Sequence, residues 1–464
     1  MLGAAQLRRR LSGALPGGTT LASLAEQEFR WYFAGTLAFF MAMQMQFVLR
    51  GYLAYELTDS ASALGLVAIS ITLPMLLVAP VAGVIADRVN KKTLLIVSQT
   101  LAAVASFAVT ALIVGDWIRF WHLLVISVVT GVVFSFNMPT RAAITPLLVP
   151  QHKLMNAISL QAGGQNLTRI FAPALGGLLI APLGAGWVYG LTGLFFIMAV
   201  FSELRLPKHG LSTPSRGTNF LQEFREGLSY VTRDRLLGML VVSGMLLPLF
   251  GFPVQQMLPI FAEDVFHQGP TGLGFLAAMS GLGGLAGAMV SANMDGQPAK
   301  GKLMFAGGIC MAVFTIAFAL APFFGLAMIF LALSNIGQML FQTTNNTVIQ
   351  AQAPPELRGR VNSLMLMSFG LMPLGVLPIT ALADEVGAPT AVASSSTVLL
   401  LTLLLLFALL GAFRNLRMDA LARTELSPVQ AAALVAEGKL SQEEADRLAN
   451  TGRRDPTRAG AARN

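Results

Sequence analysis

The sequence predicts an all-α membrane protein with about 12 transmembrane helices in two six-helix halves that are pseudo-symmetric. Of its 464 residues, 55% are hydrophobic and only 12% are charged, whereas soluble domains average about 25% charged residues. Most apolar stretches reach 20 residues or more, the length needed to span about 30 Å of hydrocarbon. A long polar gap over residues 205–235 divides these stretches into two sets.

Each apolar stretch predicts one helix, bounded by charged residues or by the breakers Gly115, Pro182, Gly184 and Pro322. The first set predicts helices over residues 31–57, 62–86, 93–115, 120–148, 154–182 and 185–204. The second set predicts helices over residues 236–262, 271–293, 303–322, 324–352, 361–383 and 389–413. Three of the separating turns are very short, so a total between about 10 and 14 helices fits the same pattern.

The domain organisation follows from these boundaries: an N-terminal tail over 1–30, a first half over 31–204, a central loop over 205–235, a second half over 236–413 and a tail over 414–464. In the last segment, Ser427-Pro428 is typical of a helix start, and Ser441 with Glu444 forms a capping-box pattern. A short helical hairpin is expected there.

The basic residues predict the orientation in the membrane. If both termini are cytoplasmic, all but three of the 31 Lys and Arg residues fall in cytoplasmic segments, the exceptions being Arg50, Arg119 and Arg169. Cytoplasmic loops carry such an excess of positive charge. The net charge of +8 is therefore interpreted as a topology signal rather than as a nucleic-acid-binding surface. We expect a multi-pass protein of the cell (inner or cytoplasmic) membrane.

Motifs of enzymes and ATP-driven pumps are absent from the sequence. No Walker motif, zinc-ligand spacing, nucleophile elbow or CxxC pair occurs, and Cys310 is the single cysteine. The glycine-rich stretch from Gly272 to Gly287 lacks the Lys-Ser/Thr of a phosphate loop, and Gly283 with Gly287 instead predicts close helix packing. We expect no enzymatic activity, no cofactor, no metal site and no nucleic-acid partner.

The turn after the second predicted helix has the sequence Gly83-Val-Ile-Ala-Asp87-Arg88-Val-Asn90-Lys91-Lys92, which resembles motif A of the major facilitator superfamily. Asn90, a residue that tolerates left-handed backbone, replaces the usual glycine. The resemblance implies a two-half transporter fold in which the motif latches the cytoplasmic side when the carrier faces outward. The implied latch residues are Gly83, Asp87, Arg88, Lys91 and Lys92.

Further segments resemble a bacterial efflux branch of this superfamily that includes the enterobactin exporter and macrolide efflux proteins. They are Leu57 to Ala61, Glu226 to Val231 and Arg358 to Val361. The run from Ala172 to Gly177 resembles the antiporter motif, with Ala172 in place of a glycine. The resemblance implies secondary active export through a cavity between the halves, coupled to an ion gradient, with a proton as the expected ion. The arginine of the family's helix 4 motif is replaced by Ser127.

Polar residues recur at helical spacing inside the predicted spans, where they cost free energy unless they face a cavity or a partner. The resemblance makes the helices over 31–57, 120–148, 236–262 and 324–352 the central cavity helices. The candidate cavity residues are Gln46, Arg50, Asn137, Arg141, Gln161, Gln165, Arg169, Gln255, Gln256, Asn335, Gln338, Gln342 and Asn345. The alternative is that these amides join helices, an interaction that contributes about 0.6–2 kcal/mol each.

Every Asp and Glu falls at a helix end, in a loop or in a tail, and none lies at the middle of a span. Proton coupling is therefore an expectation from the resemblance, with Glu56, Asp59, Glu263 and Asp384 as coupling candidates near outer helix ends. The alternative interpretation is that these are solvated acids.

The sequence thus predicts a monomeric secondary active exporter of small amphiphilic molecules, siderophore-like or drug-like, embedded in the lipid bilayer. With three arginines among the candidate cavity residues and no acid at mid-span, the cavity is expected to prefer neutral or anionic substrates over permanent cations. Two alternatives remain: an uptake carrier of the same fold, and a non-transporting receptor or scaffold that acts through its C-terminal tail.

Overall fold

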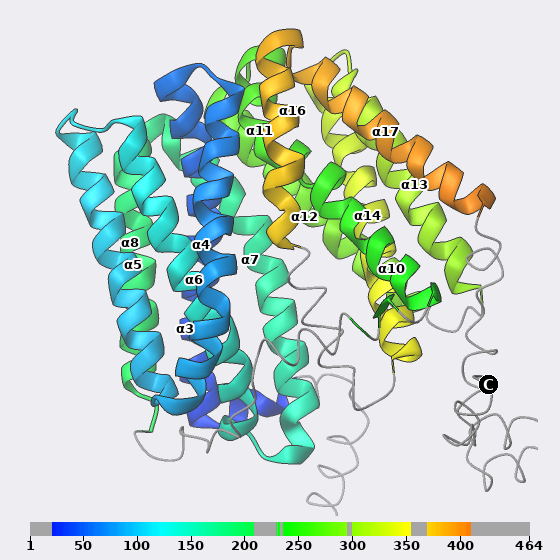
Figure 1. Ribbon diagram of the computed structural model, residues 1–464. Coiled ribbons are helices and arrows are strands. Elements are labelled where there is room, and N and C mark those ends of the chain that lie inside the picture. Colours follow the sequence, from blue (N-terminus) through cyan, green and yellow to red (C-terminus); the bar gives the residue numbers. More distant parts are fainter. Residues whose placement is uncertain are drawn as a thin grey trace, which may run out of the picture.

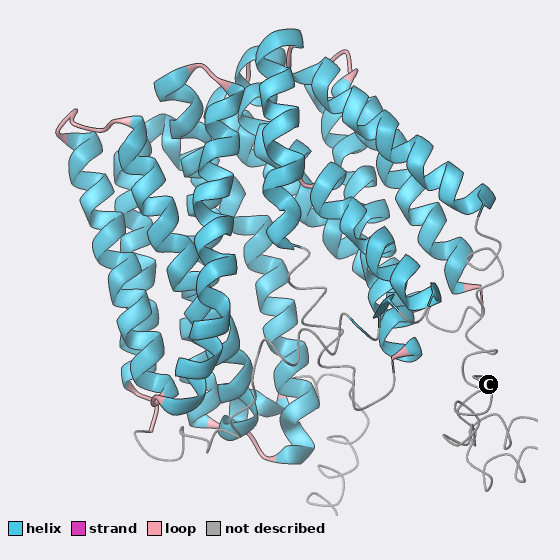
Figure 2. Ribbon diagram, in the orientation of Figure 1, coloured by secondary structure: helices cyan, strands magenta, loops and turns pink. Residues whose placement is uncertain are grey.

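The computed structural model describes residues 21–207, 229, 231–232, 235–294, 299–353 and 369–409. All regular structure in these ranges is helical (Figure 2). Eleven of the described helices are long and apolar enough to cross a membrane. The predicted all-α membrane fold is therefore confirmed. The predicted helix over 361–383 is described only from Phe369 onward.

The first set of helices packs as one group. It consists of α3 (Gln27–Thr58), α4 (Ala61–Arg88), α5 (Lys91–Val114), α6 (Phe120–Leu148), α7 (Leu154–Leu183) and α8 (Ala185–Leu204), preceded by the short η1 (Ala22–Ala25) and interrupted by η2 (Gln151–Lys153). The helix α3 contacts α7 and α8, while α5 packs on α8 and α4 packs on α6. The bounds lie within a few residues of those predicted, because apolar length and turn residues set them directly.

The second set begins with a helix that is not continuous. The predicted helix over 236–262 is divided into α10 (Arg235–Leu246), the π-helical η3 (Leu247–Gly251), α11 (Pro253–Ile260) and the π-helical η4 (Phe261–Val265). Proline lacks a backbone N–H and cannot continue the regular hydrogen-bond pattern, and Pro248, Pro253 and Pro259 occur along this stretch. The amide of Phe252 instead bonds the carbonyl of Leu247 at 3.1 Å.

The remaining helices of the second set complete its group. They are α12 (Gly269–Asn293), α13 (Lys300–Ala319), α14 (Phe324–Gln352), η5 with α16 (Phe369–Leu371 and Met372–Val386) and α17 (Ala388–Leu409). The helix α14 packs on α12 and α13, and α13 packs on α17. A Cβ added at Gly283 or Gly287 would lie 2.3 Å from the Ala332 carbonyl or 2.8 Å from the Ile336 carbonyl of α14. The prediction of close helix packing at these glycines is confirmed.

Among the described residues, the two groups share a core at one end of the bundle only. The largest cluster of buried apolar side chains crosses between them and includes Leu53 and Leu64 of the first group with Leu258, Leu273 and Ile379 of the second. This end, which carries the turns at 59–60, 266–268 and 387, is called the closed end. In Figure 1 the ribbons of the two groups meet there, at the top of the view, and diverge toward the bottom.

Toward the opposite end, called the open end, each group has a core of its own. One cluster contains Phe29, Tyr32 and Ile144, all from the first group. Another contains Leu240 and Phe341, both from the second group. The described hydrogen bonds that join the two groups lie at the closed end, between α3 and η4 and between α4 and α16.

Two helix pairs carry most of the packing between the groups. The helix α7 crosses α12 where Gly177 meets Gly274, and a Cβ added at Gly177 would lie 2.5 Å from the Gly274 Cα. The helix α4 runs beside α16, and a Cβ at Gly65 would lie 2.5 Å from the Thr380 hydroxyl. Backbones approach this closely only where small residues leave room. The glycines therefore set how tightly the closed end packs.

Several predicted features lie outside the described residues. They are most of the N-terminal tail, nearly all of the central loop over 205–235, and the tail over 414–464 with its expected hairpin. The side chains of Asp87 and Arg88 are also outside the description, although their backbone forms the last turn of α4.

Candidate functional site

Arg169, in the polar stripe of α7, lies where this helix meets α12 of the second group. Gln165 is exposed and Arg169 is partly exposed. A Cβ at Gly281 of α12 would be 2.8 Å from the Arg169 carbonyl, and one at Gly284 would be 4.0 Å from the Arg169 Nη1. Among the described residues, no hydrogen bond or ion pair engages this guanidinium. Arg169 is thus a cation at the boundary between the two groups.

Gln161, the third member of this stripe, is joined to a neighbouring helix. Its Nε2 donates to the Thr145 hydroxyl of α6 at 2.9 Å. Because both residues belong to the first group, this amide contributes to packing within the group while remaining partly exposed.

The candidate cavity residues of the second group take part in two hydrogen bonds between helices. Gln255 Nε2 donates to Asn335 Oδ1 at 3.1 Å, which joins α11 to α14. The Ser243 hydroxyl donates to Asn345 Oδ1 at 3.5 Å. Gln256 and Gln342 are partly exposed, whereas Gln338 is buried. Only some of the candidate polar residues on α11 and α14 are therefore available to a ligand in this conformation.

Four predicted cavity residues prove to be buried inside the first group. Gln46 donates to the hydroxyls of Ser106 and Thr192 at 2.7 and 3.0 Å. Asn137 donates to the Ser98 hydroxyl at 2.7 Å and is fully buried. The structure therefore contradicts a cavity-lining position for Gln46 and Asn137 in this conformation, because their polar atoms bond to helices of their own group.

Arg141, the third of these residues, forms a buried ion pair that the sequence did not predict. Its Nη2 lies 2.9 Å from Glu203 Oε1, and its Nη1 donates to the Thr36 hydroxyl at 2.6 Å. The guanidinium also stands over the Phe39 ring at 4.7 Å. Arg141 and Glu203 are 5% and 0% exposed. A charge neutralised in this way does not face a substrate.

Glu203 shows that an acid at a helix end need not be solvated. It lies one residue before the end of α8, yet its side chain is fully buried and also accepts a hydrogen bond from Gln99 at 2.7 Å. Helix-end position alone therefore did not indicate exposure. The signal that could have located it is the need of an intramembrane arginine for a carboxylate partner.

Arg50 is buried without a carboxylate. Its Nε donates to the Gln46 carbonyl at 3.2 Å, while its Nη1 has no partner among the described atoms. The Tyr189 hydroxyl is likewise unpartnered and buried. At 3% exposure, Arg50 neither extends to the membrane surface nor contacts open space in this conformation.

The motif A residues lie at the open end of α4. A Cβ at Gly83 would meet no described atom within 4 Å, so none of the described helices packs closely against it in this conformation. Asn90 has φ −59°, not a left-handed backbone, and its side chain instead caps α5 by accepting from the amide of Lys92 at 3.0 Å. Lys91 is buried, and Lys92 Nζ donates to the Leu204 carbonyl at 2.7 Å.

The four coupling candidates gather at the closed end. Glu56, Asp59 and Glu263 are exposed, and Asp59 ends α3 with a left-handed φ of 49°. Asp384 is also exposed, but its carboxylate accepts hydrogen bonds from the first turn of α4. A second bond between the groups, from the Tyr55 hydroxyl to Asp264, lies at the same end. Asp264 was not among the predicted residues.

The comparison with family models covers nearly the whole chain. Residues 18–439 match the family described as transmembrane secretion effector. Among curated relatives, macrolide efflux protein A of Streptococcus pyogenes is 24% identical over 338 residues, which cover 72% of this chain and 83% of that protein. The multidrug efflux pump Tap of Mycolicibacterium fortuitum is 28% identical over 349 residues, covering 72% and 84% respectively.

Solved structures show the same fold at low sequence identity. The nucleoside transporter NupG superposes with a TM-score of 0.68 at 13% identity, covering 82% of this chain and 99% of that one. A bacterial homologue of the lysosomal transporter Spinster, in an inward-facing and unoccupied conformation, gives 0.64 at 17% identity, with 84% and 97% covered. The match to the family model places the chain in the transmembrane secretion effector family of the major facilitator superfamily.

Proposed function

We propose that the protein is a secondary active exporter of small amphiphilic molecules that works by alternating access. The observation that carries the proposal is the asymmetry of packing: the two groups share a core at the closed end and keep separate cores toward the open end. This is one of the two states that an alternating-access carrier requires. With both termini in the cytoplasm, the open end faces the cytoplasm, the side from which an exporter takes its substrate.

The names of the relatives support drug-like substrates. One relative is named for macrolide efflux and another for multidrug efflux. Macrolides and many other drugs are amphiphilic, which fits a site that combines apolar helices with scattered amides. Siderophore-like molecules are the second substrate class that we propose, on the resemblance to the efflux branch alone.

The substrate site that we propose uses the partly exposed polar residues of both groups. Gln165 and Arg169 supply it from α7, and Gln256 and Gln342 supply it from α11 and α14. Amides can donate and accept hydrogen bonds to ligands of varied shape. Arg169 adds one charge-assisted donor.

An ion gradient, with the proton as the coupling ion, is the proposed energy source, and the carrier acts as a monomer. The sequence contains no nucleotide-binding motif, so ATP hydrolysis within the chain is not part of the proposal. Glu56, Asp59 and Glu263 are exposed at the closed end, where they can exchange protons with the outer solution in this conformation. They remain the proposed coupling residues.

Reconstitution into liposomes with an imposed pH gradient tests the proposal. We expect movement of a macrolide against its gradient, and collapse of that movement when an ionophore removes the gradient. A ligand at 100 times its dissociation constant stabilises the folded state by about 2.7 kcal/mol, so a thermal-shift screen identifies the compounds to assay. Absence of macrolide movement in liposomes, combined with drug accumulation unchanged by expression in cells, would contradict the proposal.

Replacing Arg169 with glutamine is expected to alter substrate charge preference. A charge 4 Å away interacts by about 4 kcal/mol at an effective dielectric of 20, and part of that is lost to solvent because Arg169 is partly exposed. We expect kcat/KM for an anionic substrate to fall about 10- to 100-fold, at about 1.4 kcal/mol per factor of ten. Transport assays with an anion and its neutral ester measure the difference.

The neutral ester serves as the internal control for Arg169→Gln, since its transport should change less than about threefold, equivalent to under 1 kcal/mol. Arg141 and Arg50, by contrast, are buried and do not contribute to this preference. If both substrates lost transport equally, Arg169 would serve packing of α7 on α12 rather than selectivity.

Removing the C-terminal tail separates the transporter from the receptor or scaffold alternative. A chain ending at residue 420 retains every described helix. We expect its transport rate to change by less than about twofold, because a bundle with its own core does not depend on an appended segment. Uptake assays at matched expression, checked by in-gel fluorescence, measure the rate. Complete loss of transport in a stably expressed truncation would favour the alternative.

A further inference from the structure

The carboxylate of Asp384 caps a helix that belongs to the other half of the protein. Its Oδ1 accepts from the Ala61 amide at 2.6 Å, and its Oδ2 accepts from the Ser62 amide at 3.0 Å and from the Ser60 hydroxyl at 3.1 Å. The Ser62 hydroxyl also donates to it. Asp384 lies near the end of α16, whereas all of its partners begin α4.

This cap replaces one that α4 would otherwise supply itself. The first amides of any helix lack partners within the helix, and a serine at the N-cap position commonly accepts from one of them. Ser60 occupies the N-cap of α4, but its side chain makes no capping bond of that kind. Two amides of the first turn, those of Ala61 and Ser62, are instead bonded by Asp384, and the positive N-terminus of the helix favours a carboxylate there.

The cap exists only while the two halves are in contact at the closed end. Gly65 and Thr380, one turn further along the same two helices, are in close contact. Separating α4 from α16 would leave the α4 amides and the Asp384 carboxylate to bond with water. A polar contact of this kind stabilises one conformation only slightly, because both partners can be solvated once they separate. The two helices can therefore still move apart.

We propose that Asp384 is the latch of the closed end, and that it balances the latch expected from motif A at the opposite end of the same helix. The helix α4 has 28 residues, about 42 Å at 1.5 Å per residue, with the Asp384 cap at its first turn and Asp87 in its last. The two latches stabilise opposite states of the carrier. This inference rests on the proposed alternating-access function and assigns Asp384 a structural role in place of proton coupling.

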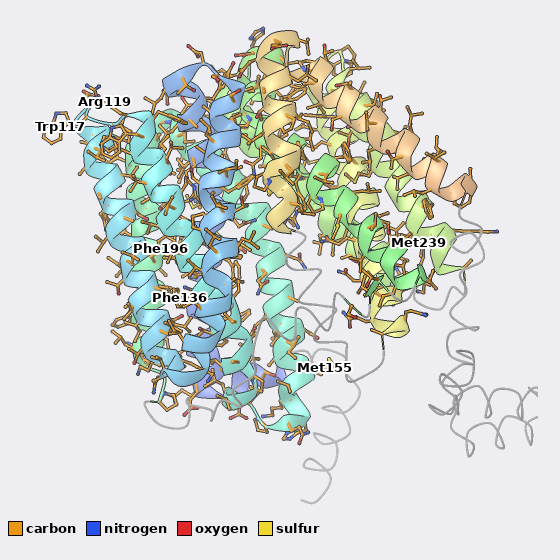
Figure 3. All side chains as sticks on the ribbon, in the orientation of Figure 1. Trp117, Arg119, Phe136, Met155, Phe196 and Met239 are labelled. Atoms are coloured by element: carbon orange, nitrogen blue, oxygen red, sulfur yellow. The ribbon has the colours of Figure 1, made fainter. Side chains whose placement is uncertain are left out.

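Distances between spin labels in lipid nanodiscs test the latch. Cys310 is replaced by serine, and one pair of labels is placed at the exposed residues Trp117 and Leu320 of the closed end. A second pair at Met155 and Gln350 reports on the open end. Figure 3 shows Trp117 and Met155 at opposite ends of the first half. The two pairs together give the population of each state.

Asp384→Asn removes the charge but keeps the size of the side chain. We expect it to lower the ratio of closed-end-packed to closed-end-separated molecules by about tenfold, which corresponds to about 1.4 kcal/mol. Ser62→Ala, which removes one donor and leaves the helix intact, should lower the ratio by about threefold in the same direction. Asp87→Asn should shift the populations the opposite way.

Glu385→Gln is the matched control, because Glu385 is the exposed neighbouring acid on the same helix. The proposed role of Asp384 is contradicted if Asp384→Asn and Ser62→Ala leave the populations of the two states unchanged. It is also contradicted if Glu385→Gln shifts these populations as much as Asp384→Asn does. The unmutated protein tests the underlying function separately. If its labels show a single state under every lipid and substrate condition, alternating access itself is wrong, whatever Asp384 does.

Discussion

Replacing Gly177 with alanine is expected to reduce transport at least about 100-fold while each half of the protein still folds. The added Cβ would lie 2.5 Å from both the Gly274 Cα and the Pro270 carbonyl, and 2.7 Å from the Gly274 amide nitrogen. All three are backbone atoms of α12, so no side-chain rotation relieves the overlap. The helices α7 and α12 must separate at the closed end, and the carrier loses the state seen here.

The adjacent Gly176 supplies a matched control. A Cβ there would find its nearest neighbours in Met45 at 3.8 Å, an ordinary contact, so Gly176→Ala should transport at a rate within about twofold of the parent protein. The closed-end spin-label pair should report separation in Gly177→Ala and none in Gly176→Ala. Near-normal transport by Gly177→Ala would show that the crossing of α7 and α12 is loose during the transport cycle.

This comparison also shows how far a motif can be interpreted without a structure. The run from Ala172 to Gly177 consists mostly of small residues, which allow helix backbones to approach closely. It does not reveal which of the two adjacent glycines makes the contact, nor that Gly274, 97 positions later, is the partner. Pairing between distant segments depends on how the halves dock, which local sequence does not encode.

The helices themselves were the most predictable part of the fold. A membrane span needs about 20 apolar residues, so length and turn residues locate it, as α8 (Ala185–Leu204) shows. The π-helical breaks at Leu247–Gly251 and Phe261–Val265 were missed. Hydropathy does not distinguish a π-helical turn from a regular one, and a proline can either kink a helix or be accommodated in it.

The candidate site was predicted less well, because helical spacing identifies the face of a residue but not its neighbour. In the predicted α7 stripe, Arg169 lies against α12 of the second half, whereas Gln161 bonds to Thr145 of the first half. Asn137 and Arg141 were chosen as cavity residues by the same reasoning, but both are buried inside the first half. Glu203, the partner of Arg141, lies 62 positions later in the sequence, at a helix end where an acid is usually solvated.

Removing the carboxylate of Glu203 is expected to destabilise the first half strongly. In Glu203→Gln, Arg141 keeps its hydrogen bond to Thr36 but becomes a buried cation with no counter-charge among the described residues. Breaking a buried pair by removing one partner costs about 3–5 kcal/mol. Thermal unfolding of purified protein, followed by size-exclusion chromatography after heating, should show a large loss of stability.

Two further variants test whether the loss of stability comes from the unpaired charge of Arg141. Glu263→Gln removes an exposed carboxylate at the closed end and should change stability by less than about 0.5 kcal/mol. The double variant Glu203→Gln with Arg141→Met removes both charges, and we expect it to recover at least half of the lost stability, since an apolar replacement of a buried ion pair is often tolerated. If Glu203→Gln were as stable as the parent protein, the hydrogen bonds of Arg141 to Thr36 and its contact with the Phe39 ring would be sufficient to hold it, and the ion pair would not stabilise the fold.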